Sequence, residues 1–472
     1  MSSSFNTVYS SLCELAGVAG RLLTPEDAEE YDEAREVFYG DIDKHPSAIV
    51  RVANVEDVQR AVATARDEGY ELAIRSGGHS PIGHSTTDGG LVIDLRDLSA
   101  IDVDTKARTA WIETGATALQ VTEALSEDGL AIGFGDAGSV GVGGITLAGG
   151  IGYLVRKFGM TIDSMLAAHI VTADGRTRRV DSEHEPDLFW AIRGGGGNFG
   201  VVTRILFRLH PLPHFTGGLL ILPATSETIA AFTATALAAP DELSTIANVM
   251  APPPLPFLPA EVHGSLVILA NIAFAGDDDA ATRAMAPFRA LATPLVDMVK
   301  PTSYLTMYPP EDRNRRPTMI TRTMFVDSVD VKTSATVHRF LARPCPTLHA
   351  VQLRVLGGAM SRVPADATAF AHRARAILIN VSASYNGAED RRVQRTWVSE
   401  FARAIQPREN GAYVGFLSDD GPARIRFTYP GETGERLMRV KSQYDPTNLF
   451  RLNQNIAPSA RLLDMVPGVP PG

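Results

Sequence analysis

The feature that most constrains this chain of 472 residues is a dense run of glycines in its first third. Nine of the twenty residues from Gly133 to Gly152 are glycine, namely Gly133, Gly135, Gly138, Gly141, Gly143, Gly144, Gly149, Gly150 and Gly152. Glycine loses more backbone entropy on folding than other residues, so such a run destabilises a chain unless its backbone must turn sharply or approach a ligand closely. We therefore predict that this segment lies against something flat or charged.

A dinucleotide-binding fingerprint is one interpretation of residues 141–144, which read GVGG. That fingerprint requires an apolar strand before it and a helix that opens at its last glycine. Residues 135–139 read GDAGS, which is not a strand pattern, and residues 148–150 read AGG, which we expect to break any helix. A nicotinamide site is therefore disfavoured, and a tight glycine loop without a ligand remains the plain alternative.

A second glycine turn lies upstream, where residues 74–80 read IRSGGHS after a predicted strand. Two successive glycines let the backbone turn tightly and present its N–H groups, which suits a pyrophosphate or the edge of a ring system. A histidine at the end of such a turn, here His79, can act as a nucleophile towards a cofactor carbon. Taken alone, the segment is more often a plain surface turn. We call residues 74–80 the histidine loop.

Two further segments have the same character. Residues 193–202 read RGGGGNFGVV and enter a predicted strand, and residues 453–456 read NQNI shortly after YDPTNLF at 444–450. Each of them alone could be a turn.

The predicted elements divide the chain into three zones. The first zone, to about residue 213, alternates strands with helices and so favours an α/β pattern; its predicted strands are 71–75, 91–94, 110–114 and 169–172, and its helices 55–68 and 117–128. The second zone, 214–411, suggests a sheet with helices on one face; its strands are 218–222, 264–274, 350–356 and 376–382, and its helices 226–237 and 280–291. Asp279 is expected to cap the last helix and Pro287 to kink or break it. The third zone has a helix at 434–443.

Charge and cysteine content exclude several classes of protein. The chain carries 44 basic and 54 acidic side chains, a formal net charge of −10, without a basic run. A nucleic-acid partner is therefore not expected, and the phosphates of a cofactor would be held by backbone N–H groups. Cys13 and Cys345 form no paired-thiol motif, which leaves a disulfide open but unsupported. With neither a signal peptide nor a membrane span, we expect a cytoplasmic protein.

In this order, the motifs resemble the FAD-linked oxidases of the vanillyl-alcohol-oxidase or para-cresol-methylhydroxylase fold, and among them the berberine-bridge-enzyme-like group. The segments that carry the resemblance are 75–79 (RSGGH), 140–144 (VGVGG) with 149–152 (GGIG), 198–202 (NFGVV), and 444–446 (YDP) with 453–456 (NQNI). The resemblance is strong over about residues 46–212 and 434–458 and weak over the middle of the chain.

The resemblance implies an α+β fold of two lobes. An α+β FAD lobe comes from the N- and C-terminal segments, and a substrate lobe has an antiparallel sheet covered by helices. We place the FAD lobe at residues 1–213 and the substrate lobe at 214–411. A C-terminal berberine-bridge-like segment at 412–472 returns to the FAD lobe.

The resemblance also implies the cofactor and its ligands. FAD is bonded through its 8α-methyl group to His79, and the positions placed around it are Arg75, Ser76, Gly77, Gly78, His79, Ser80, Gly83, His84, Gly138, Ser139, Val140, Gly143, Gly144, Ile145, Gly150, Gly152, Gly200, Val201, Val202, Asn453 and Asn455. Many members carry a second link from a cysteine three residues before Val140, where this chain has Ala137, so a single link is implied. A small residue at Val140 favours reaction with dioxygen.

The implied activity is hydride transfer from a small organic substrate to the flavin, followed by reoxidation by O2 to hydrogen peroxide. A dehydrogenase with another electron acceptor, a flavin-binding protein without turnover and a glycine-rich protein without flavin remain as alternatives. No metal is implied, and a homodimer is left open. Amine-oxidising members carry Lys and Glu near residues 351–356, where this chain has Gln352, Arg354 and Leu356. An alcohol, phenol or sugar-like lactol therefore fits at least as well as an amine.

An alcohol substrate would need a base near the reacting carbon. The candidates are Tyr385, Arg354 and His372 in the middle of the chain, and His84 just after the histidine loop. Tyr385 and Arg354 rank first because their segments match strands that floor the family's substrate pocket, with Arg354 orienting the substrate as a permanent cation. The plain alternatives are a half-buried anchor for Tyr385, a structural hydrogen-bonding group for His372 and a carboxylate partner for Arg354.

Overall fold

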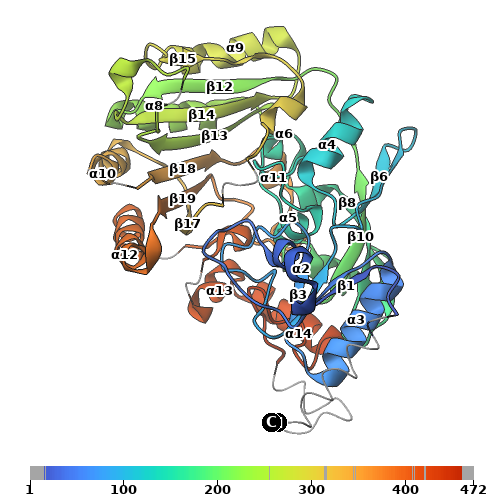
Figure 1. Cartoon of the computed structure of the whole chain (residues 1–472). Coiled ribbons are helices and arrows are strands. Elements are labelled where there is room, and N and C mark those ends of the chain that lie inside the picture. The colour runs from blue at the N-terminus through green and yellow to red at the C-terminus, as the bar shows by residue number, and fades with distance from the viewer. Residues whose placement is uncertain are drawn as a thin grey trace.

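The protein has two lobes that lie side by side, as Figure 1 shows. The structure is a computed structural model, and it describes residues 15–459 apart from residues 16, 255, 313–315, 344, 346, 407, 409, 419 and 420. The chain builds most of the first lobe, crosses to the second, and returns to the first at its C-terminal end. Cys13 lies outside the described residues, and Cys345 is a free thiol.

The described residues of the first lobe form two large sheets and one short two-stranded sheet. One is a mixed sheet in the order β1 (Arg21–Leu23), β2 (Ala48–Arg51), β4 (Leu91–Asp94) and β3 (Leu72–Arg75), with the last three strands parallel. The other is antiparallel, in the order β5 (Ile101–Asp104), β6 (Thr109–Glu113), β10 (Val201–Arg208), β8 (Met165–Val171) and β9 (Thr177–Asp181). Helix α3 (Val55–Glu68) joins them, because its buried face shares a hydrophobic core with Val171 and Val201.

The second lobe is one eight-stranded antiparallel sheet. Its order is β15 (Val296–Asp297), β12 (Thr216–Pro223), β14 (Val267–Phe274), β13 (Leu243–Met250), β18 (His349–Val355), β19 (Ile377–Ser384) and β17 (Met319–Val326), with β16 (Lys300–Pro301) beside β12. One face packs under four helices, namely α8 (Ser226–Ala238), α9 (Asp278–Arg289), α10 (Val331–Leu341) and α12 (Gly387–Ile405). These elements run from Thr216 to Ile405, and on that basis we propose domain boundaries near residues 213 and 411.

Shorter elements complete the fold. In the part of the chain that the structure describes, the remaining helices are α2 (Ala28–Arg35), α4 (Ala118–Ser126), α5 (Val142–Ala148), α6 (Val155–Phe158), α7 (Pro186–Ile192), α11 (Ala359–Arg362), α13 (Pro422–Thr428) and α14 (Glu432–Tyr444), with five 3-10 turns. Strands β7 (Leu130–Ala131) and β11 (His210–Pro211) pair with each other. Among the described residues, no helix combines the length and apolar character needed to cross a bilayer.

Local signals explain where several predicted elements begin. Asn54 caps α3 by accepting a hydrogen bond from the Asp57 N–H at 2.9 Å, and this helix spans the predicted residues 55–68. Thr117 caps α4 in the same way, through the Gln120 N–H at 3.3 Å. Strand β4 also has its predicted bounds.

Three expectations were wrong in detail. The α/β pattern of the first zone holds only for the sheet that contains the parallel strands β2, β4 and β3. The other large sheet is antiparallel because turns of only a few residues join β5 to β6 and β8 to β9. The α+β class that the resemblance implied is therefore the right one. The glycine run contains a helix that was not predicted, α5, although Gly149 ends it, as was expected of residues 148–150. Helix α9 begins after Asp277 and passes through Pro287, which disturbs only its last turn.

Candidate active site

A cavity of about 660 Å³ lies where the two lobes meet. The histidine loop, the glycine run, residues 196–200 and residues 450–454 line it from the first lobe. Side chains of β13, β17, β18 and β19 line it from the second lobe. A volume in this range, lined by both backbone and side chains, is typical of a cofactor or substrate site.

Glycine is required at positions 77 and 141 because the backbones of the histidine loop and the glycine run are in direct contact there. A Cβ atom at Gly77 would lie 2.2 Å from the backbone N of Gly141, and one at Gly141 would lie 2.0 Å from the Ser76 Oγ. The Ser76 hydroxyl donates to the Thr114 carbonyl at 2.5 Å and so ties the histidine loop to the second sheet. Only glycine permits this approach, which brings both loops to one wall of the cavity.

Two other glycines leave open space. Apart from its chain neighbours and its own helix, a Cβ atom at Gly144 or Gly197 would meet no atom of the described residues within 4 Å, and both residues line the cavity. Ser85 and Asn453 also line it, and the Ser85 Oγ and Asn453 Oδ1 are buried without a hydrogen-bond partner among the described residues. Buried polar atoms without a hydrogen-bond partner, next to space that no side chain fills, indicate a site that binds a polar ligand.

Thirteen of the predicted cofactor positions line the cavity and eight do not. Those that do are Ser76, Gly77, Gly78, His79, Ser80, His84, Val140, Gly143, Gly144, Ile145, Gly200, Val202 and Asn453. Those that do not are Arg75, Gly83, Gly138, Ser139, Gly150, Gly152, Val201 and Asn455.

The positions outside the cavity have other tasks. Arg75 is buried and donates to the carbonyls of Ala34, Arg35 and Ser85, which fixes the chain around the histidine loop. A Cβ at Gly152 would lie 1.5 Å from the Phe134 carbonyl oxygen, so this glycine serves backbone packing. Val201 belongs to the core beneath α3.

His79 stands in a defined setting. Its ring stacks on Phe38 with the ring centres 4.1 Å apart, and its Nε2 lies 2.9 Å from the Ser139 Oγ. Burial is the main cause that lowers the pKa of His79 to about 4, against the opposing effects of Glu311, Ser139 and Asp136. The imidazole is therefore neutral near pH 7, which is the form that can act as a nucleophile.

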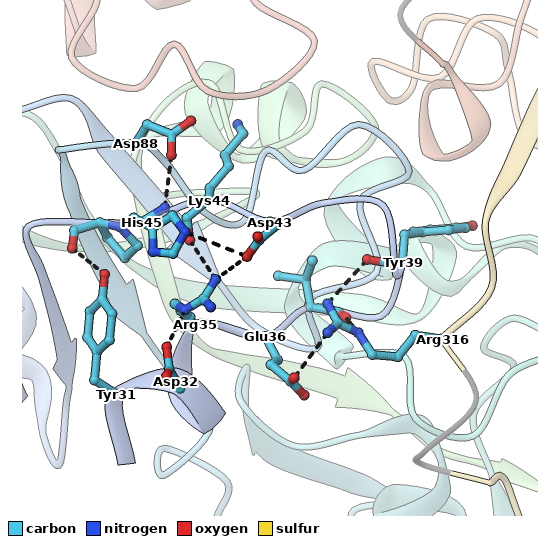
Figure 2. A network of polar contacts seen from close by, with 12 residues as sticks. Tyr31, Asp32, Arg35, Glu36, Tyr39, Asp43, Lys44, His45, Asp88 and Arg316 are labelled. Atoms are coloured by element: carbon cyan, nitrogen blue, oxygen red, sulfur yellow. Dashed lines mark hydrogen bonds and ion pairs between the residues drawn. The ribbon is translucent and has the colours of Figure 1, made fainter. Parts of the chain in front are cut away.

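Phe38 belongs to a segment without helix or strand, residues 36–46, which we call the strap. Figure 2 shows the polar network that fixes it: Arg35 lies between Asp32 and Asp43, and Asp88 accepts from the His45 N–H at 2.8 Å. The Phe38 N–H also donates to the Gly78 carbonyl at 3.2 Å. The strap is thus held across the histidine loop.

The second lobe holds the other side of the strap. Arg316 donates to the carbonyls of Val37 and Tyr39 and pairs with Glu36 at 3.1 Å, while the Tyr39 ring points away from this network (Figure 2). Tyr39 lines the cavity, and burial first, then Asp136 and Asp41, raises its pKa to about 12. Its phenol is therefore neutral, and it closes the cavity at the junction of the lobes.

The catalytic candidates fall into two groups. Arg354 and His84 line the cavity. Tyr385 and His372 are not among the lining residues, and their polar groups are engaged elsewhere: the Tyr385 hydroxyl donates to Asp41 of the strap, and the His372 Nε2 lies 3.0 Å from the Thr428 carbonyl. We therefore do not retain these two as base candidates, because neither can reach a substrate in the cavity.

Arg354 pairs with a carboxylate, which was the plain alternative to a role in substrate binding. Its side chain is buried, with an exposed fraction of 4%, and its Nη2 donates to the Asp136 Oδ2 at 2.7 Å. Its Nη1 donates to the Ile151 carbonyl at 2.7 Å and its Nε to the Gln352 Oε1 at 2.8 Å. Sequence reasoning missed Asp136, although its place inside the glycine run was a usable signal.

A buried clasp brings the C-terminal segment back to the cavity. The Lys441 ammonium of α14 donates to Asp445 at 2.6 Å and to the carbonyls of Asn198 at 2.7 Å and Phe450 at 2.9 Å. Asp445 in turn accepts from the N–H groups of Leu449 and Phe450. The YDP motif therefore fixes Phe450 and Asn453 against residues 197–200, where both line the cavity.

Comparison with known proteins identifies families and relatives that match this chain. A family model described as FAD binding domain matches residues 46–181, and one described as berberine and berberine like matches residues 412–457. An uncharacterised FAD-linked oxidoreductase, YgaK of Bacillus subtilis (strain 168), is 31% identical over 465 residues, which is 95% of this chain and 99% of the relative.

Two oxidases show the same likeness. The (R)-6-hydroxynicotine oxidase of Paenarthrobacter nicotinovorans is 29% identical over 95% of this chain and 99% of its own. A crystal structure of 6-hydroxy-D-nicotine oxidase from Arthrobacter nicotinovorans superposes with a TM-score of 0.82 at 26% identity, and the match covers 94% of this chain and 99% of that one. The resemblance inferred from the motifs is thereby confirmed.

Proposed function

This chain belongs to the FAD-linked oxidoreductases with a berberine-like C-terminal segment, and on that premise we propose that it is an oxidase with a single covalent flavin link at His79. The observation that carries the proposal is the neutral, stacked His79 at the wall of a cavity that both lobes share. The substrate is a small organic molecule, and the products of turnover include hydrogen peroxide.

The residues present fit FAD. Gly144 and Gly197 leave room along the first-lobe wall, and the orphaned Ser85 Oγ and Asn453 Oδ1 are available as hydrogen-bonding partners. With no lysine lining the cavity among the described residues and its one arginine engaged, the pyrophosphate would rest on backbone N–H groups. When bound, FAD supplies a two-electron acceptor for hydride and a site of reaction with O2.

The covalent link is proposed at the Nδ1 atom of His79. Ser139 engages Nε2, and Phe38 fixes the plane of the ring, so Nδ1 is the nitrogen left to form the bond. The Ser139 hydroxyl also bonds to Glu311, which sets its direction. Ala137 stands where many family members have a second attachment, so His79 is the single tether.

Substitution of Gly144 tests the cofactor site without disturbing the protein around it. Gly144→Val directs a branched side chain into the open space, and we expect a folded protein with little or no flavin, measured as the ratio of flavin to protein absorbance. Gly144→Ala is the matched control; it should keep flavin and gain up to about 1 kcal/mol from the better helix propensity of alanine. Full flavin loading in Gly144→Val would show that the cofactor lies elsewhere.

The oxidase activity is tested with a substrate panel coupled to peroxide detection in air. We expect at least one compound to bleach the flavin absorbance under anaerobic conditions and to yield peroxide when O2 is admitted. Bleaching without peroxide would replace the oxidase by a dehydrogenase. A holoprotein that yields an unmodified His79 peptide on mass analysis would remove the covalent claim.

A further inference from the structure

Asp136 occupies a special place in the cavity. It is the only carboxylate among the described residues that line it, and its side chain keeps an exposed fraction of 29% while its partner Arg354 is buried. Its charge acts on His79 of the first lobe, and Arg354 and Gln352 of the second lobe hydrogen-bond to it. Asp136 therefore lies between His79, the proposed site of flavin attachment, and the sheet of the second lobe.

Among the described residues, only one carboxylate oxygen of Asp136, Oδ2, takes part in hydrogen bonds. Oδ2 accepts from Arg354 at 2.7 Å and lies 3.5 Å from the Gln352 Nε2. No hydrogen bond to Oδ1 occurs from the residues that the structure describes, so Oδ1 can accept from a bound molecule. Arg354 also donates to Ile151 and Gln352, so three of its five N–H donors are engaged and its side chain holds Asp136 in place.

A row of three amides crosses the sheet beside Asp136. Asn248 of β13 is paired in register with Gln352 of β18, which is paired with Asn380 of β19. Side chains alternate between the two faces of a strand, so these amides face the cavity while Val249, Val351 and Val381 lie under the helices. We call Asn248, Gln352 and Asn380 the amide row.

The amide row carries an unsatisfied acceptor. The Asn380 Oδ1 is buried and has no hydrogen-bond partner among the described residues. Ser382 and Thr321, paired one step along the sheet, add hydroxyls to the same wall. Amides and hydroxyls both donate and accept, which matches the hydroxyl groups of a substrate better than a lone charge.

We propose that Asp136 is the base that takes the hydroxyl proton of a neutral alcohol or lactol, and that the amide row binds the other polar groups of that substrate. The inference rests on the proposed function and names its substrate class. A cationic amine is disfavoured because Arg354 already neutralises Asp136 at 2.7 Å.

In an alcohol or a lactol, the O–H bond breaks and its proton passes to the Asp136 Oδ1, while the C–H bond at the same carbon breaks and its hydrogen leaves with two electrons, for which bound flavin would be the acceptor. The carbon–oxygen bond becomes a carbonyl, so the substrate is oxidised by two electrons and the flavin is reduced by two. O2 then takes the two electrons and two protons to give hydrogen peroxide, and Asp136 returns its proton.

Asp136→Asn tests the base, because the amide keeps its size and its bond to Arg354 but cannot take a proton. We expect anaerobic flavin reduction by a neutral substrate to slow by about 10²–10⁴-fold. Binding of the substrate, followed as a shift of the flavin absorption bands, should change little. Asp241→Asn is the matched control, since Asp241 pairs with Arg362 on the surface, away from the cavity.

The pH profile separates a base from a merely structural residue. Groups that act electrostatically on Asp136 or contact it are Arg354, His79, Tyr39, Tyr153, Tyr308 and Tyr413. Burial holds the pKa of His79 to about 4 and raises the pKa of Tyr39 to about 12, so neither titrates near neutrality. A pH dependence of flavin reduction that the wild type shows and Asp136→Asn lacks would therefore identify a base, whereas loss of a merely structural residue would leave the shape of the profile unchanged.

The substrate class is tested with matched probes: D-xylose, cellobiose and benzyl alcohol as neutral compounds, and benzylamine as the cation. We expect one or more neutral probes, and not benzylamine, to bleach the flavin. Bleaching by benzylamine alone, or an Asp136→Asn protein that a neutral probe reduces at the wild-type rate, overturns this inference and leaves the oxidase intact. A flavin that no probe bleaches overturns the inference together with the proposed function.

Discussion

Replacement of His79 by alanine is expected to release the flavin on denaturation. In the wild type, acid precipitation should leave the yellow colour in the protein pellet, because a covalent bond holds the cofactor. In His79→Ala the glycine loops still offer the cavity, so the folded protein should bind FAD, but precipitation should move all of it to the supernatant. Flavin absorbance in the two fractions measures the change.

His84→Ala is the control for this result, since His84 also lines the cavity a few residues further along the chain. Its flavin should remain in the pellet. If His79→Ala retains covalent flavin, the tether is another residue, and the stacked, neutral imidazole has a different task.

Lys441→Met is expected to give the largest loss of stability among single substitutions in the C-terminal segment. Lys441 and Asp445 both have fully buried side chains, and burial lowers the pKa of Lys441 while Asp445 opposes that change. Removal of the ammonium leaves a buried carboxylate and the carbonyls of Asn198 and Phe450 without their donor, which costs about 3–5 kcal/mol. Calorimetry of the holoprotein should show a clearly lower unfolding temperature.

Two variants control this prediction. Lys441→Met combined with Asp445→Asn removes both charges and should recover part of the loss, because an uncompensated buried charge is the main cost. Arg362→Met breaks an exposed ion pair with Asp241 and should cost no more than about 1 kcal/mol. Equal losses of stability in Lys441→Met and Arg362→Met would mean that the buried Lys441–Asp445 pair stabilises the protein no more than an exposed ion pair does.

Part of the site could be predicted because it depends on local backbone chemistry. Gly77 and Gly141 are required wherever two backbones approach this closely, and the sequence places both beside motifs that serve a flavin in the family. The predicted histidine, Val140 and Asn453 all line the cavity for the same reason. The proposed base, Asp136, was not predicted in this way: Tyr385 ranked high because its segment matches a family strand, and both Tyr385 and His372 face other partners.

The local sequence specifies the glycine loops, His79 at the end of one of them, the start of α3 after Asn54 and the absence of a cysteine at position 137. These features act within a few residues or through a motif. Which side chains share the cavity depends on contacts between segments that are distant in the sequence. Asp136 and Arg354 are far apart in the sequence, and Phe38 reaches His79 through a strap held by the second lobe. Such contacts depend on how the lobes close on each other, and no local pattern records that geometry.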